Sequence, residues 1–236
     1  MRVAALIPAY QAAAHLGQVL LGLQALADPP EVLVVDDGSR DATAEVARQH
    51  GARVHSFAAN RGKGHALLAG FELLRDFDGV VTLDADGQHP PECFPAFVDV
   101  AGGGADLVLG TRARTRDMPP GRRFANAASS GWTAWLAGQP VSDSQSGYRL
   151  YTRRLLRRTP ITPGRYEVET EVLVRASRLG FRFAEVVIPT VYGDAGSHIH
   201  PFRDVPRIAS VLMRLTLEHV APPRVMREAL QRGEAA

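Results

Sequence analysis

The chain has 236 residues, 45% of them hydrophobic, and a nearly balanced formal charge of +2. This length suits one domain with a full core, since domains commonly contain about 100 to 200 residues. Cys93 is the only cysteine, so no internal disulfide can form, and a cytoplasmic location is expected. The apolar run at the N-terminus is too short for a secretory signal, and no apolar stretch approaches the roughly 18 to 20 residues of a membrane helix.

The positive charges are almost all arginines, because Lys63 is the only lysine, and the pI is about 9.0. A guanidinium group can donate two parallel hydrogen bonds to a phosphate. An arginine-rich chain is therefore compatible with phosphorylated ligands, nucleic acid or an anionic membrane surface, and composition does not choose among them.

The first half of the chain alternates strands with helices. Apolar and β-branched runs predict strands over residues 3–7, 31–35, 53–57, 79–83 and 106–109. Helical spacing predicts helices over 12–26, 41–50, 64–77 and 91–101, the second of them capped by Asp41. This alternation predicts a mostly parallel α/β sheet with helices on both faces.

The second half is less regular but is expected to complete the same domain, over residues 1–220. Helices are predicted over 122–136, 167–179 and 204–218, and strands over 148–151 and 182–188. The last helix would place four apolar residues on one face: Ile208, Val211, Leu212 and Leu215. The tail, residues 221–236, is expected to fray.

Acidic residues follow two of the predicted strands, at the edge where ligands bind to open parallel sheets. Asp36 and Asp37 follow one strand, where a capped strand-to-helix turn is an equally good interpretation. Asp84 and Asp86 follow another, and two carboxylates so close together repel each other unless a cation or several donors offset their charge. With Gln88 as a third oxygen ligand, they predict a Mg²⁺ or Mn²⁺ site, and a turn with solvated aspartates is the alternative.

A basic, glycine-punctuated segment at residues 60–65 follows the third predicted strand. Its helix entry, with Arg61 and Lys63, suits an anion, although such entries often bind nothing. The segment lacks the P-loop pattern, and Pro8-Ala9-Tyr10-Gln11 after the first strand lacks the glycines of a dinucleotide fingerprint. We interpret His89, beside two prolines, as part of a turn.

Taken in order, these motifs resemble the signature of family 2 glycosyltransferases. The chain is most similar to the dolichyl- or polyprenyl-phosphate mannosyltransferase-like branch, over about residues 2–215. The motifs that carry the resemblance are Ile7-Pro8-Ala9-Tyr10, Val35-Asp36-Asp37-Gly38-Ser39, Asn60-Arg61-Gly62-Lys63-Gly64, Leu83-Asp84-Ala85-Asp86-Gly87-Gln88-His89-Pro90, Gly110-Thr111-Arg112, Asp143-Ser144-Gln145-Ser146-Gly147-Tyr148-Arg149 and Glu169-Thr170-Glu171.

The resemblance implies a GT-A type, Rossmann-like fold with a donor site for a nucleoside diphosphate sugar. Asp84 and Asp86 would form the Asp-x-Asp element, with Asp86 and Gln88 nearest the metal and Asp84 at the ribose or the metal waters. Arg112 would contact phosphate, and Arg123 is a looser match to a second phosphate-binding residue. The nucleotide pocket would be formed by Pro8, Ala9, Tyr10, Asp37, Lys63, Asp84 and Ala85.

The implied reaction is a metal-dependent, inverting transfer of a hexose from GDP-mannose or a UDP-sugar. The acceptor would be a polyprenyl phosphate at the membrane surface, which needs no strong general base, or a hydroxyl group, which does need one. Asp143 is the first candidate for that base, with a turn residue as the alternative, and Glu171 is the second, with a helix-surface or arginine-paired carboxylate as the alternative. No nucleic-acid partner is expected.

Two departures and two rival functions limit the inference. Gln11-Ala12 stands where this branch usually has an Asn-Glu pair, so the base preference is open, and no transmembrane pair follows residue 220. A sugar-phosphate nucleotidyltransferase would need a glycine-rich basic loop after the first strand, which Pro8-Ala9-Tyr10-Gln11 does not provide. A non-catalytic protein that binds a nucleotide sugar or a lipid phosphate is the other alternative.

Overall fold

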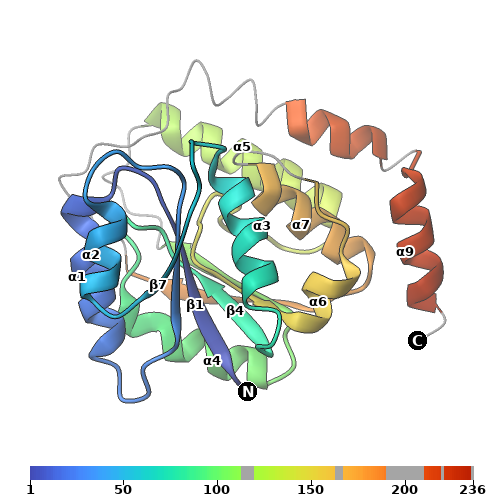
Figure 1. Ribbon diagram of the computed structural model, residues 1–236. Helices are drawn as coiled ribbons and strands as arrows, with labels where there is room; N and C mark the ends of the chain where they lie inside the picture. Colours follow the sequence, from blue (N-terminus) through green and yellow to red (C-terminus); the bar gives the residue numbers. More distant parts are fainter. Residues whose placement is uncertain (113–119, 163–166, 190–209, 219–220, 235–236) are drawn as a thin grey trace.

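Seven strands form one sheet in the order β3-β2-β1-β4-β6-β5-β7 (Figure 1). The computed structural model describes residues 1–112, 120–162, 167–189, 210–218 and 221–234, except for the side chains of 120–128, 167 and 232–234. The strands are β1 (Val3–Ala9), β2 (Val32–Asp36), β3 (Arg53–Ser56), β4 (Gly79–Thr82), β5 (Leu107–Arg112), β6 (Arg149–Thr152) and β7 (Phe183–Ile188).

One strand runs against the others, so the mostly parallel sheet that the sequence predicts is a mixed sheet. β6 lies between β4 and β5 and is antiparallel to both, whereas the other pairs are parallel. Because of its direction, β6 begins at the edge where β1, β2 and β4 end. The segment before β6 is therefore brought to the edge that carries the acidic clusters.

Helices cover both faces of the sheet, as expected. Figure 1 shows α1 and α2 on one side of β1 and α3 and α7 on the other. One core packs α1 and α4 against residues such as Ile7 and Val34, and the other packs α3, α5 and α7 against residues such as Leu6 and Val35. The long helices are α1 (Ala13–Gln24), α3 (Lys63–Leu73), α4 (Phe94–Gly102), α5 (Pro120–Ala137) and α7 (Glu167–Arg178), and the shorter ones are α2 (Thr43–Gln49) and α6 (Arg153–Arg158).

Several boundaries differ from the predicted ones. α2 begins after Ala42, and Asp41 accepts a hydrogen bond from the Thr43 N–H without being the capping residue. The predicted helix 91–101 begins as a 3-10 turn, Pro91–Cys93, because a proline suits a first turn. α6 was not predicted.

The C-terminal part is more ordered than the sequence indicates. Residues 210–218 are helical, with Val211, Leu212 and Leu215 buried as predicted, while Ile208 lies outside the described residues. The tail that was expected to fray contains α9 (Arg224–Glu234), with Met226 and Ala229 buried. Within the described part of the chain, no helix is long and apolar enough to cross a membrane.

Candidate active site

The candidate site lies at the carboxyl edge of the sheet, where the ends of β1, β2 and β4 meet the start of β6. Pro8 and Ala9 are buried at the end of β1, and Tyr10 extends from it, half exposed. The next residue, Gln11, has a φ of 52°, and its side-chain oxygen accepts hydrogen bonds from the N–H groups of Arg40 and Asp41. This side chain holds the loop after β2 in place.

Asp37 fixes the turn that leads into α3. One of its carboxylate oxygens accepts a hydrogen bond from the Arg61 N–H and the other from the Gly62 N–H, both at 2.7 Å. Gly62 has a φ of 97°, a conformation that favours glycine. The buried Asp37 thereby sets the position from which Lys63 enters the site.

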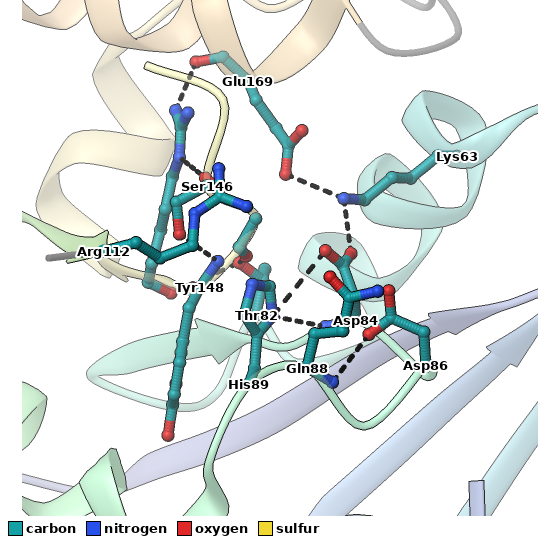
Figure 2. A network of polar contacts seen from close by, with 12 residues as sticks. Lys63, Thr82, Asp84, Asp86, Gln88, His89, Arg112, Ser146, Tyr148 and Glu169 are labelled. Atoms are coloured by element: carbon teal, nitrogen blue, oxygen red, sulfur yellow. Dashed lines mark hydrogen bonds and ion pairs between the residues drawn. The ribbon is translucent and has the colours of Figure 1, made fainter. Parts of the chain in front are cut away.

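Lys63 lies between two carboxylates, as Figure 2 shows. Its Nζ donates a hydrogen bond to Asp84 Oδ1 at 2.6 Å and lies 3.1 Å from Glu169 Oε1. The three residues come from the start of α3, the turn after β4 and the first turn of α7. The sequence places Lys63 and Asp84 in one site, whereas it identifies Glu169 only within the motif Glu169-Thr170-Glu171 and does not pair it with Lys63.

The two carboxylates keep Lys63 charged. Burial opposes the charge, but the carboxylates of Asp84 and Glu169 outweigh that effect and raise the pKa of Lys63 above its ordinary value. Burial would likewise raise the pKa of Asp84, but the charge of Lys63 is stronger and lowers it. Lys63 and Asp84 are therefore an ion pair at neutral pH.

This ion pair predicts how stability changes with pH. A lowered carboxyl pKa contributes stability above the ordinary value of 3.8, which is lost as the pH falls toward the folded pKa. A raised lysine pKa contributes stability below the ordinary value of 10.5, which is lost as the pH rises toward the folded pKa. In urea titrations, we expect Lys63→Met to be less stable than the wild type at neutral pH, by an amount that shrinks as the pH falls, because protonation relieves the unpaired buried carboxylate of the variant. A difference that grows below about pH 4 would contradict the ion pair.

Asp86, Gln88 and His89 complete the turn after β4. Asp86 Oδ1 accepts a hydrogen bond from the Gln88 N–H at 3.0 Å, and both side chains are partly exposed. His89 is buried, and its Nδ1 accepts a hydrogen bond from the Asp84 N–H, so its proton is on Nε2. This agrees with the interpretation of His89 as a turn residue, and burial lowers its pKa.

The donor set fits a hard cation that takes few ligands from the protein. Asp86 and Gln88 offer carboxylate and amide oxygens on one turn, which Figure 2 shows side by side. No group of three or more His, Cys, Asp or Glu residues in the described part of the chain is arranged to hold a metal. Mg²⁺ and Mn²⁺ suit such a site, because substrate phosphates and water complete their coordination.

Arg112 and Asp143 form a second ion pair at this edge. Arg112 Nε donates a hydrogen bond to Asp143 Oδ2 at 2.8 Å, and Asp143 Oδ1 accepts one from the Gln145 N–H. Burial would lower the pKa of Arg112, but Asp143 outweighs it and raises that pKa. With both carboxylate oxygens engaged, Asp143 orients Arg112 in this structure.

Arg149 fixes the segment before β6. Its side chain is fully buried, and its guanidinium donates hydrogen bonds to the backbone oxygens of Ser144, Ser146 and Glu169 at 2.7 to 2.8 Å. One buried cation thereby joins the Asp143 segment to the first turn of α7. The motif containing Arg149 was recognised in the sequence, but its structural role was not.

One sequence candidate lies elsewhere, and the side chain of another is not described. Glu171 is 1% exposed and pairs with Arg175 and Arg214, while its Oε1 also accepts a hydrogen bond from the Thr162 N–H. It is the arginine-paired carboxylate that the sequence left as the alternative to a general base. Arg123 is in α5, but its side chain lies outside the described residues.

Comparisons with known proteins agree with this architecture. Residues 4–164 match the model of the family described as Glycosyl transferase family 2. The chain is 32% identical over 218 residues to a dolichyl-phosphate hexose transferase of Haloferax volcanii, covering 92% of this chain and 94% of that one. It is 34% identical over 210 residues to an undecaprenyl-phosphate mannosyltransferase of Micrococcus luteus, covering 83% and 86%.

A solved structure shares the fold. The glucosyl-3-phosphoglycerate synthase of Mycobacterium tuberculosis, in complex with Mn²⁺, uridine diphosphate and glucosyl-3-phosphoglycerate, superposes with a TM-score of 0.74. The two sequences are 26% identical, and the match covers 94% of this chain and 80% of that one. The GT-A type fold expected from the sequence is confirmed.

The chain therefore belongs to the family 2 glycosyltransferases. The expected enzyme class, a hexosyltransferase, and the resemblance to the polyprenyl-phosphate branch are both confirmed. Membership favours a glycosyltransferase over the nucleotidyltransferase and the non-catalytic alternatives.

Proposed function

We propose that the protein transfers a hexose from a nucleoside diphosphate sugar to a polyprenyl phosphate, with inversion at the anomeric carbon. The observation that carries the proposal is the convergence of Lys63, Asp84, Asp86 and Arg112 at one sheet edge. A diphosphate needs cationic partners, and a sugar transfer needs its departing charge offset. The names of the two sequence relatives support the acceptor class.

The donor is proposed to bind with its nucleoside along the end of β1. Pro8 and Ala9 form a buried floor there, and the half-exposed Tyr10 offers a ring face beside it. Asp37 and Ala85 would border the same pocket, and Asp37 acts partly through the turn that it holds. Asp84 would face the ribose side.

A divalent cation, Mg²⁺ or Mn²⁺, is proposed to be held by Asp86 and Gln88, while Asp84 would contact the water molecules bound to the metal. When bound, it offsets the charge that develops on the departing diphosphate. Arg112 would contact the same phosphates, oriented by Asp143 through the hydrogen bond at 2.8 Å. Arg123 is proposed as a second phosphate contact.

A phosphate acceptor explains why no free general base is required. A phosphate monoester carries about −1.5 to −2 charges near neutral pH, so its oxygen is already nucleophilic. Asp143 is engaged by Arg112, and Glu171 is buried between two arginines. We retain Asp143 as the base only for a hydroxyl acceptor.

Action at a membrane surface is part of the proposal. The helix at 210–218 buries one face and leaves Met213 and Leu217 exposed. Exposed apolar side chains on a chain that is rich in arginine suit an anionic lipid interface, from which a polyprenyl phosphate can be reached. We propose a peripheral position on the cytoplasmic face.

The test is transfer of labelled hexose from GDP-mannose, UDP-glucose or UDP-galactose to a short-chain polyprenyl phosphate in detergent. We expect one donor to give product with Mn²⁺ or Mg²⁺ and none with excess EDTA. The nucleoside diphosphate of that donor should raise the unfolding temperature of the protein, since a ligand that binds the folded state stabilises that state. Transfer to a hydroxyl acceptor but not to the lipid phosphate would reject the acceptor assignment.

A further inference from the structure

The only lysine of the chain sits where a metal and a lysine would compete for one carboxylate. Lys63 Nζ lies 2.6 Å from Asp84 Oδ1, and Asp84 belongs to the proposed metal element. The lysine side chain is 18% exposed, so water screens its charge poorly. A divalent cation beside Asp84 and the ammonium of Lys63 on its Oδ1 would be close together, so the two positive charges would repel each other.

Glu169 provides a second position for the same ammonium. Its Oε1 is 3.1 Å from Lys63 Nζ, which makes an ion pair. That oxygen is buried, and its contact with the ammonium does not meet the geometry of a well-formed hydrogen bond. A buried carboxylate oxygen without a hydrogen bond is unfavourable, so Glu169 has an unused capacity to accept one from Lys63.

Glu169 is also held firmly enough to receive the lysine. Arg149 donates a hydrogen bond to the Glu169 backbone oxygen at 2.7 Å, which fixes the first turn of α7. On the other side, the Gly147 backbone lies close to both Lys63 and Asp84. The ammonium can thus turn from one carboxylate to the other without leaving the cluster.

We propose that Lys63 neutralises Asp84 when the donor site is empty and turns to Glu169 when a metal and a nucleoside diphosphate bind. Glu169 is then a positioning residue that acts through Lys63. This inference rests on the proposed function, because it takes Asp84 as part of the metal element. It predicts weak binding of the metal alone and much tighter binding when a nucleoside diphosphate binds together with it.

Mn²⁺ binding measured by electron paramagnetic resonance, without any sugar donor or acceptor, tests the inference. Lys63→Met removes the competitor, so it should bind Mn²⁺ more tightly than the wild type, by about 5- to 150-fold, the usual range of coupling between two ligands. Glu169→Gln weakens the second position and should bind Mn²⁺ several-fold less tightly. Arg154→Met is the control, because Arg154 pairs with Asp106, away from this cluster, and should bind Mn²⁺ as the wild type does.

The double variant separates the role of Glu169 from a simple loss of negative charge. If Glu169 acts through Lys63, Glu169→Gln should have little effect on Mn²⁺ affinity in the Lys63→Met background. An equal loss in both backgrounds would instead show that Glu169 attracts the metal directly and would overturn its positioning role. Lys63→Gln, checked by circular dichroism, replaces Lys63→Met if the latter does not fold.

Unchanged or weaker Mn²⁺ binding by both lysine variants would overturn the competition itself. Failure of the proposed function gives a different result. The Mn²⁺ affinities would then follow the predicted order, but no donor would yield a transferred hexose. The competition for Asp84 is thus measured by Mn²⁺ binding, and the proposed function is measured separately by hexose transfer.

Discussion

Replacement of Asp86 with alanine is expected to lower hexose transfer by about 10²- to 10³-fold or more, the usual effect of removing one electrostatic contact to a transition state. Asp86 is partly exposed, and within the described part of the chain its carboxylate accepts a single hydrogen bond, from the neighbouring Gln88 N–H. Few contacts depend on this carboxylate, so the variant should keep the fold. The lost rate would therefore report on the metal.

The measurement pairs initial rates with nucleotide binding. We expect Asp86→Ala to retain binding of the nucleoside diphosphate without metal, seen as a thermal shift, and to lose the additional shift that Mn²⁺ gives to the wild type. Asp99→Ala is the matched control, since Asp99 is an exposed aspartate on α4. Transfer by Asp86→Ala at half the wild-type rate or more would reject Asp86 as a metal ligand.

The parts of the site that follow parallel strands could be predicted from the sequence. Asp37 and Asp84 each follow a strand whose apolar residues show that it is buried, and the ends of parallel strands meet at one edge. The segment from Gly62 to Lys63 follows β3 for the same reason. Strand order along the chain was therefore sufficient to bring these residues together.

The direction of β6 could not be predicted from the sequence pattern. An apolar run predicts a strand but carries no information on whether that strand runs parallel to its neighbours. Antiparallel pairing with β4 and β5 brings Asp143 and Gly147 to the same edge as Asp84. The partnership of Arg112 with Asp143 depends on this pairing.

The sequence also does not show which of Glu169 and Glu171 faces the site. Two residues along a helix are about 200° apart around its axis, so the side chains face opposite directions. Glu169 faces Lys63, whereas Glu171 faces Arg175 and Arg214. Helical periodicity separates the two faces, but only the packing of α7 on the sheet shows which face meets the site.

Replacement of Gly147 with alanine is expected to lower kcat/KM by about 10²-fold while the protein stays folded, since a displacement of about 1 Å can have this effect on catalysis. A Cβ atom at this position would lie 2.7 Å from Asp84 Oδ2 and 2.8 Å from Lys63 Nζ. Gly147 is not among the residues with a positive φ, so alanine fits the backbone and only the contact is unfavourable. The Asp84–Lys63 pair must therefore shift.

The same substitution at Gly102 provides the control. Gly102 ends α4, and an added Cβ would meet nothing within 4 Å there. Both variants are compared by urea unfolding and by initial rates at varied donor concentration. We expect Gly147→Ala to lose little stability, because the contacted atoms are the ends of side chains that can shift, and most of the kinetic loss to be in kcat. If Gly147→Ala reacted as fast as Gly102→Ala, a shift of Asp84 and Lys63 would leave the transition state unaffected. The close approach of the Gly147 backbone to this pair would then have no part in catalysis.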